Sequence, residues 1–150
     1  FSGDHTSSHA SLPEFSNGIG RFRVPIFFYF PGGNLKEKSN KNIQQIDIMP
    51  SLIDLLHIKT NMVTFGKSYQ SDKDFVVYYL DNIYHYIQGD YYMAFDGKKA
   101  LALYNFKKDE LMKTNLLSTE KEKTVTMERF IKAYVQSFNE RIINNKLTVH

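Results

Sequence analysis

The first apolar stretch of the chain, residues 23–30, is a continuous run of aromatic and branched side chains. It reads Arg-Val-Pro-Ile-Phe-Phe-Tyr-Phe and is followed directly by Pro31-Gly32-Gly33. An uninterrupted apolar run that ends at turn residues is typical of a strand with both faces buried. We therefore predict a buried strand here, with Pro25 near its start, where a missing N–H is tolerated.

A second pattern, with helical spacing, follows a polar loop. Apolar side chains within residues 47–57 lie three and four positions apart, at Met49, Leu52, Ile53 and Leu56. This spacing predicts a helix with one face packed inward, with Asp47 as its N-cap and Pro50 in its first turn. Asp54 falls on the polar face of the helix, so neither carboxylate is expected to be catalytic.

A third pattern, of aromatic and β-branched residues broken by turn pairs, begins at Phe75. Seven aromatic residues lie between Phe75 and Tyr92, a composition that favours strands. Turn pairs such as Asp96-Gly97 separate the apolar groups. The predicted strands are Phe75–Leu80, Tyr84–Gln88, Asp90–Phe95 and Ala100–Tyr104. Short strands joined by tight turns predict a small antiparallel sheet.

The last part of the chain carries the pattern of a long amphipathic helix. Thr119 and Glu122 have the spacing of a capping box, and one apolar stripe continues behind them to about Asn145. The stripe consists of Met127, Phe130, Ile131, Tyr134, Val135, Phe138 and Ile142. We expect this stripe to pack against the core.

Composition restricts the classes of function. A chain of 150 residues with 42% hydrophobic and 23% charged residues is expected to form one folded domain, or most of one. It has no cysteine, which excludes disulfides, thiol nucleophiles and Cys-ligated clusters. A net charge of +3 with scattered basic residues gives no support to a nucleic-acid partner. No segment approaches the ~18 apolar residues of a membrane helix.

The first candidate chemistry is the dipeptide Asp4-His5. A carboxylate and an imidazole on one loop can bind a divalent cation together, although such a pair also makes ordinary local hydrogen bonds in many loops. His9 follows four residues later and is a second metal ligand, a substrate contact or a solvated side chain. No Gly-x-Ser-x-Gly elbow surrounds Ser7 or Ser8, so a serine triad is not supported. Because the chain opens at Phe1, without Met, and reaches this chemistry at once, we expect a fragment of a longer protein.

The aromatic strands leave a second class of function open. Tyrosines between Tyr78 and Tyr92 could form a platform for a glycan or a partner protein in a non-catalytic module. Packing within the core and on the sheet surface is the alternative interpretation of the same residues.

An ordered set of short motifs runs from Gly3 to about Leu117. Gly3-Asp4-His5 precedes the apolar run at residues 23–30, and residues 45–52 read Gln-Ile-Asp-Ile-Met-Pro-Ser-Leu. The motifs that follow are Phe65-Gly66-Lys67-Ser68, Leu103-Tyr104-Asn105-Phe106, Asp109 and Asn115-Leu116-Leu117. This order resembles the C-terminal part of the sulfatase branch of the alkaline phosphatase superfamily. More closely, it resembles the lipoteichoic acid synthase family of membrane-anchored phosphoglycerol transferases and their sulfatase relatives.

The resemblance implies an α/β fold: the C-terminal portion of an alkaline-phosphatase-like α/β/α sandwich with a small antiparallel sheet and a long C-terminal helix. Residues 1–150 would be a C-terminal fragment of a single sulfatase-like catalytic domain. The implied enzyme transfers or hydrolyses phosphate or sulfate esters through a covalent intermediate on an upstream threonine or serine. No catalytic nucleophile would then lie in this chain. Upstream membrane helices would anchor the domain outside the cytoplasm.

The resemblance also assigns roles to individual residues. Asp4 and His5 would be two ligands of one divalent metal ion, Mn²⁺ in the first place and Mg²⁺ or Zn²⁺ as alternatives. His9 and Arg21 are candidate substrate contacts, whereas Arg23 leads into the predicted strand and is as readily structural. The expected partners are a lipid or glycan ester of phosphate or sulfate and the upstream part of the same protein. Sulfatases commonly carry a lysine soon after this loop, but residues 6–22 contain none, which weighs against a true sulfatase.

Overall fold

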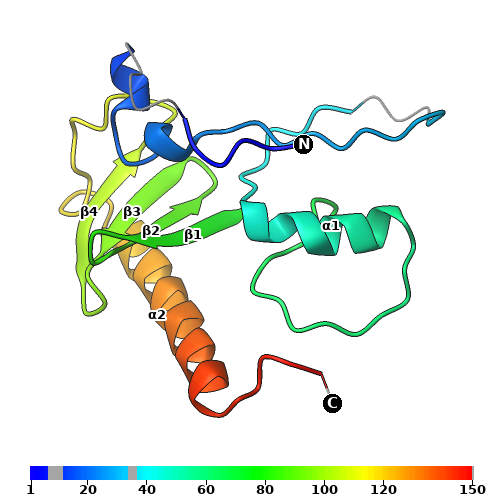
Figure 1. Cartoon of the computed structure of the whole chain (residues 1–150). Coiled ribbons are helices and arrows are strands. Elements are labelled where there is room, and N and C mark those ends of the chain that lie inside the picture. Colours follow the sequence, from blue (N-terminus) through cyan, green and yellow to red (C-terminus); the bar gives the residue numbers. More distant parts are fainter. Residues whose placement is uncertain (7–11, 34–36, 150) are drawn as a thin grey trace.

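A computed structural model describes residues 1–6, 12–33 and 37–149 of the chain. Its centre is a four-stranded antiparallel sheet in the order β1-β2-β3-β4, in which each strand pairs with its neighbour in the sequence (Figure 1). The strands are β1 (Phe75–Leu80), β2 (Ile83–Gln88), β3 (Tyr91–Phe95) and β4 (Ala100–Asn105). The mixed α/β class and the small antiparallel sheet are therefore confirmed, with strand bounds within one residue of the predicted ones.

Tight turns that accept positive φ connect these strands. Asp81 and Asn82 have φ values of 51° and 61°, as the two-residue hairpin turn between β1 and β2 requires. Gly89 and Gly97, which lie in the next two turns, also have positive φ. Because Asn, Asp and Gly tolerate this region of φ best, the turn pairs in the sequence fix where each strand ends.

One face of the sheet is covered by α2 (Lys121–Ile143), the predicted long C-terminal helix (Figure 1). Met127 and Ile131 are fully buried against the sheet. The sheet residues of this core are Phe75, Tyr86, Met93, Phe95 and Leu103. Phe138 and Ile142, further along the same stripe, are exposed because the last turns of α2 extend past the sheet (Figure 1).

The predicted capping box at the start of this helix is wrong. The helix begins at Lys121 with Glu120 at its N-cap position, and no side chain caps it. The Thr119 hydroxyl instead donates to the Leu116 carbonyl, inside the turn that precedes the helix. Among the described residues, no helix is both long and apolar enough to cross a lipid bilayer.

Two short 3-10 turns, η1 (Pro13–Phe15) and η2 (Gly20–Phe22), lie over the opposite face of the sheet. The Tyr78 hydroxyl of β1 donates to the Gly18 carbonyl at 2.5 Å. The rings of Tyr78 and Phe22 lie 5.2 Å apart. Both faces of the small sheet are thus in contact with other parts of the chain.

The predicted buried strand at residues 23–30 is not formed. The segment is extended, yet the described residues give it only an isolated bridge between Ser2 and Ile26. The side chains of Tyr29 and Phe30 are 75% and 62% exposed. A strand needs neighbours for its backbone N–H and C=O groups, and no sheet in the described ranges reaches this segment. Instead the chain runs outward, away from the sheet (Figure 1).

The predicted helix at residues 47–57 forms as α1 (Ile48–Leu55), directly after a third 3-10 turn, η3 (Gln45–Asp47). Its predicted inward face is wrong. Met49 and Leu56 are exposed, and the buried residues are Pro50 and Ser51. The physical reason is that α1 projects from the edge of the molecule (Figure 1), so only the side that carries Pro50 and Ser51 is covered by other residues.

Candidate metal-binding site

Asp4 and His5 lie side by side on an exposed loop, as the sequence predicts. Asp4 Oδ2 is 3.5 Å from His5 Nε2, and the two side chains are 88% and 64% exposed. The His5 backbone N–H donates to Asp4 Oδ1 at 3.0 Å, and His5 Nδ1 is 2.7 Å from the Thr6 carbonyl oxygen. Since a carbonyl oxygen only accepts, Nδ1 carries the proton in the neutral imidazole, which leaves the lone pair on Nε2, the nitrogen that lies 3.5 Å from Asp4 Oδ2.

This arrangement fits a divalent cation. Ligand atoms bound at ~2.0–2.2 Å lie roughly 3.0–3.5 Å apart in tetrahedral or octahedral geometry, and the Oδ2–Nε2 distance of 3.5 Å agrees with this. A hydrogen bond from the other ring nitrogen to a carbonyl is the contact that orients ligating histidines. The backbone N–H groups of Asp4 and His5 hold the pKa of the Asp4 carboxyl below its usual range, which favours the ionised form that binds a cation.

The pair supplies two ligands and no more. In residues 1–6, 12–33 and 37–149, no group of three or more His, Asp or Glu side chains could hold a metal ion. Any further His, Asp or Glu ligand of an ion at Asp4 and His5 would therefore come from outside the described residues.

Backbone carbonyls of this loop are held by side chains from two other segments. The Thr6 hydroxyl donates to the Arg21 carbonyl at 2.7 Å. The Gln45 side-chain amide donates to the carbonyl of Gly3 at 2.8 Å and, more weakly, to that of Asp4 at 3.4 Å. Gln45 belongs to η3, so the position of the metal loop depends on the start of α1.

A buried ion pair fixes that start. Lys67 Nζ donates to Asp47 Oδ2 at 2.6 Å, to the Asn42 carbonyl at 3.0 Å and to the Phe75 carbonyl at 2.8 Å. The backbone N–H groups of Gln44 and Lys67 donate to the same Asp47 carboxylate. Asp47 does occupy the predicted N-cap position of α1, but its side chain does not cap the helix; it closes the turn before the helix and pairs with Lys67.

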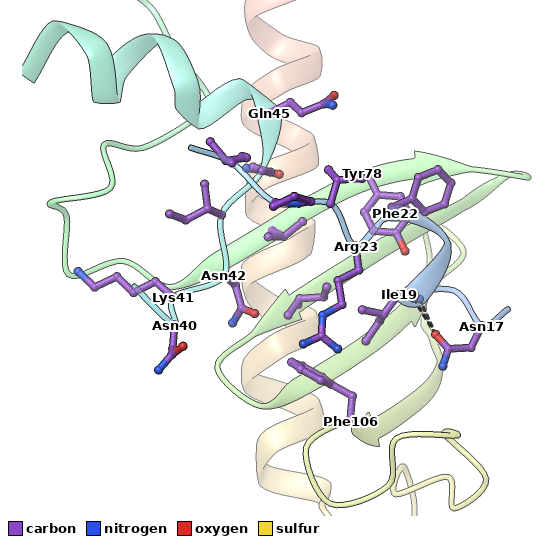
Figure 2. A pocket seen from close by; sticks show the side chains of 18 of the residues that line it. Asn17, Ile19, Phe22, Arg23, Asn40, Lys41, Asn42, Gln45, Tyr78 and Phe106 are labelled. Carbon is purple, nitrogen blue, oxygen red and sulfur yellow. Dashed lines mark hydrogen bonds between the residues drawn. The ribbon is translucent and has the colours of Figure 1, made fainter. Parts of the chain in front are cut away.

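A hollow of about 870 Å³ lies between the N-terminal segment, residues 38–45 and the β1 edge of the sheet, and Asp4 lines it. Figure 2 shows Arg23 pointing into this hollow. Its other charged lining residues are Lys38, Lys41, Lys107, Glu14 and Glu110. The structure therefore brings Asp4 and Arg23 to one cavity. The sequence alone did not predict this proximity, because residue 23 was assigned to a buried strand.

The other predicted substrate contacts are placed differently. Arg21 is exposed, contributes its backbone carbonyl to Thr6 and is not among the described residues that line the hollow. His9 lies outside the described residues.

The tyrosines of the sheet are mostly engaged in packing. His85 stacks on Tyr78 with ring centroids 4.5 Å apart and an interplanar angle of 3°, and its Nδ1 is 2.7 Å from the Tyr92 hydroxyl. Burial raises the pKa of Tyr92 to about 12 and lowers the pKa of His85. Of the strand tyrosines, Tyr79 is the exposed one. This arrangement agrees with the packing interpretation and offers little open surface for a glycan platform.

Comparison with known proteins relates the chain to a sulfatase. No protein-family model matches the chain. An arylsulfatase of Clostridium perfringens (strain 13 / Type A) is 29% identical in an alignment 143 positions long that covers 82% of this chain. The chain spans only 30% of the length of that relative. The similarity supports a relation to sulfatases, in agreement with the order of motifs, and does not distinguish the lipoteichoic acid synthase type.

Proposed function

We propose that the chain is the C-terminal part of a longer, metal-dependent enzyme of the sulfatase type that acts on phosphate or sulfate esters. The observation that carries the proposal is the Asp4-His5 pair, whose Oδ2 and Nε2 atoms lie 3.5 Å apart. Asp4 also lines a hollow that receives the Arg23 side chain. The similarity to an arylsulfatase that is much longer than this chain supports both the class of reaction and the existence of further polypeptide.

In this proposal Asp4 and His5 hold the divalent ion, Mn²⁺ in the first place. When bound, such an ion stabilises negative charge on the non-bridging oxygens of the ester. Arg23, whose planar guanidinium carries several donors, binds an anionic ester oxygen from within the hollow. Gln45 keeps the loop carbonyls in place, so that the two ligand atoms stay oriented.

The nucleophile of this proposal is a threonine or serine outside the chain. Its oxygen forms the new bond to phosphorus or sulfur while the leaving alcohol departs. The oxygen of water or of an acceptor hydroxyl then attacks the same phosphorus or sulfur atom, which breaks the bond to the nucleophile and releases it.

A finer proposal concerns the substrate and the location. The motif order supports a lipoteichoic acid synthase-like phosphoglycerol transferase, anchored by upstream helices and working outside the cytoplasm. The name of the curated relative favours a sulfate ester, whereas the absence of lysine from residues 6–22 favours a phosphate ester. His9 and Arg21 remain proposed substrate contacts at either kind of ester.

The test uses the complete product of the gene that encodes this chain. The protein is stripped of metal with a chelator, reloaded with Mn²⁺, and assayed on 4-nitrophenyl sulfate and on a phosphoglycerol-bearing lipid. Asp4→Asn and His5→Ala are expected to lower the rate by at least about 100-fold, because each removes a group that holds the charge-stabilising ion. The matched control is Asp54→Asn, which changes an exposed carboxyl on α1 and should leave the rate unchanged. A rate that survives Asp4→Asn would refute the proposal.

A further inference from the structure

Three side chains form a cluster on the face of the sheet that is turned away from α2. Tyr78 of β1 stacks on His85 of β2 with ring centroids 4.5 Å apart, and His85 Nδ1 lies 2.7 Å from the hydroxyl oxygen of Tyr92 on β3. Tyr92 is buried and the other two side chains are half-buried. We call these three residues the aromatic cluster.

The backbone of Gly18 lies directly on the aromatic cluster. The Tyr78 hydroxyl donates to the Gly18 carbonyl at 2.5 Å. A Cβ atom at residue 18 would lie 3.1 Å from the Tyr92 hydroxyl oxygen and 3.8 Å from His85 Nδ1. Because glycine has no Cβ, the backbone can approach the two polar side chains this closely. The cluster therefore holds a backbone segment that is distant in the sequence.

Gly18 belongs to a tightly packed unit, residues 13–23, which contains η1 and η2. Asn17 Oδ1 accepts a hydrogen bond from the Gly20 backbone N–H at 2.8 Å. A Cβ atom at Gly20 would lie only 1.9 Å from the Glu14 carbonyl oxygen, so η1 and η2 pack backbone against backbone. A contact made at Gly18 thus determines where the whole unit lies on the sheet.

The end of this unit is connected to both functional features of the proposed site. The Arg21 carbonyl accepts hydrogen bonds from the backbone N–H of Thr6 at 3.3 Å and from its hydroxyl at 2.7 Å. The Thr6 carbonyl lies 2.7 Å from Nδ1 of His5. Arg23, which points into the hollow (Figure 2), directly follows η2, and its backbone N–H donates to the Gly20 carbonyl. A shift of η2 would therefore displace both the histidine ligand and the arginine.

We infer that the aromatic cluster positions the metal loop: it holds η2 against the sheet, and η2 in turn orients His5 through the hydrogen bonds of Thr6. Its members are positioning residues, because they act on the ligand atoms through η2. The metal ion in this inference rests on the proposed function, whereas the placement of η2 concerns this chain alone.

A single atom separates this role from simple packing. Tyr78→Phe retains the ring that stacks on His85 and lies 5.2 Å from the ring of Phe22. It removes only the hydroxyl that donates to the Gly18 carbonyl. If the cluster merely fills space, the substitution should leave the metal loop unchanged.

The first measurement is hydrogen–deuterium exchange of the complete gene product without metal. The amides of Thr6 and Phe22, which donate to carbonyls of residues 21 and 19, should exchange about 3- to 10-fold faster in Tyr78→Phe, the effect of losing one hydrogen bond. Tyr79→Phe is the matched control. Its hydroxyl donates to the Asn82 side chain on the exposed side of the hairpin, so both exchange rates should stay unchanged.

The second measurement is Mn²⁺ affinity, followed by electron paramagnetic resonance of the unbound ion. Tyr78→Phe should weaken binding by about 3- to 10-fold, whereas Tyr79→Phe should bind normally. Gly18→Ala places a methyl group 3.1 Å from the Tyr92 hydroxyl oxygen and should weaken binding similarly. Thr6→Val removes the hydroxyl that donates to η2. The double variant with Tyr78→Phe should bind no more weakly than Thr6→Val alone, because both changes act through the same connection.

Three results would overturn the inference. They are unchanged exchange at Thr6 in Tyr78→Phe, faster exchange with normal Mn²⁺ affinity, and additive losses of affinity in the double variant. Failure of the proposed function is recognised separately, because the wild-type protein would then bind no Mn²⁺ at Asp4 and His5. In that case the exchange rates alone decide whether the aromatic cluster positions this loop.

Discussion

Replacement of Lys67 by Met tests how far the buried ion pair holds the first half of the molecule together. Lys67 Nζ joins three segments through the Asp47 carboxylate and the carbonyls of Asn42 and Phe75. Methionine has a similar length and volume but no charge and no donor. The substitution therefore removes the contacts of the ammonium group with little change in packing.

The expected loss of stability follows from burial. The Lys67 and Asp47 side chains are 5% and 0% exposed, so Lys67→Met leaves a carboxylate without a counter-charge and out of reach of water. Breaking a buried pair in this way costs about 3–5 kcal/mol. For a unit of this size, each 1 kcal/mol lowers the melting temperature by about 2–4 °C. The expected shift is thus about 6–20 °C.

Thermal unfolding followed by circular dichroism measures this shift, with Lys132→Met as the matched control. Lys132 pairs with Glu128 on the surface of α2, and an exposed pair of this kind contributes only about 0.3–0.5 kcal/mol. Adding Asp47→Asn to Lys67→Met should recover part of the loss, because the uncompensated charge is then gone. If Lys67→Met and Lys132→Met shift the melting temperature equally, the pair does not hold these segments together.

Three further predictions concern the site, a glycine and pH. Gln45→Leu removes the donor to the carbonyls of Gly3 and Asp4, so Mn²⁺ should bind about 10-fold more weakly in isothermal titration. Gly66→Ala should destabilise the protein by about 1–3 kcal/mol in urea unfolding, because the new Cβ would lie 2.2 Å from the Ile46 carbonyl oxygen. Burial lowers the pKa of His85 in the folded state, so the unfolded chain binds more protons below pH ~6.5, and the free energy of unfolding should decrease as the pH falls below that value.

Each of these has its own control. Gln45→Glu keeps an acceptor but loses the donor. Normal Mn²⁺ binding by both Gln45 variants would show that the hydrogen bonds from Gln45 to the loop carbonyls do not affect metal binding. Gly89→Ala meets no atom within 4 Å and should cost only the strain of its positive φ, so an equal cost at Gly66 would contradict the clash. His85→Gln should flatten the decrease of stability on acidification, and an unchanged pH profile would assign that decrease to other groups.

Sequence reasoning succeeded where the pattern is local and failed where the partner is distant. The four strands follow from runs of aromatic residues between turn pairs such as Asp81-Asn82, and all of that information lies within a few residues. Lys67 stood out only as part of the motif Phe65-Gly66-Lys67-Ser68, and its ion pair could not be predicted because its partner Asp47 is 20 positions away.

Hydrophobic patterns indicated the local conformation of a segment but not which other residues would pack against its apolar side chains. The spacing of Met49, Leu52 and Leu56 correctly predicted a helix, whereas the run at residues 23–30 predicted a buried strand that does not form, although the segment is extended. Both patterns also predict burial, which the described part of the chain does not provide. At the candidate site, the Asp4-His5 dipeptide was visible in the sequence. The orientation of its ligand atoms was not, since it depends on the Thr6 carbonyl and on Gln45 from another segment.

The sequential order of the strands has a consequence for how the chain acquires its structure. Each strand pairs with the next one in the sequence, so every closure along the sheet spans a short loop and loses little chain entropy. The sheet and α2 together occupy residues 75–143, and the contacts of their shared core lie within that range. This part can reach its native arrangement first, and the preceding segments can settle on it afterwards. A partial digest by a protease should accordingly accumulate one resistant piece that begins near Phe75.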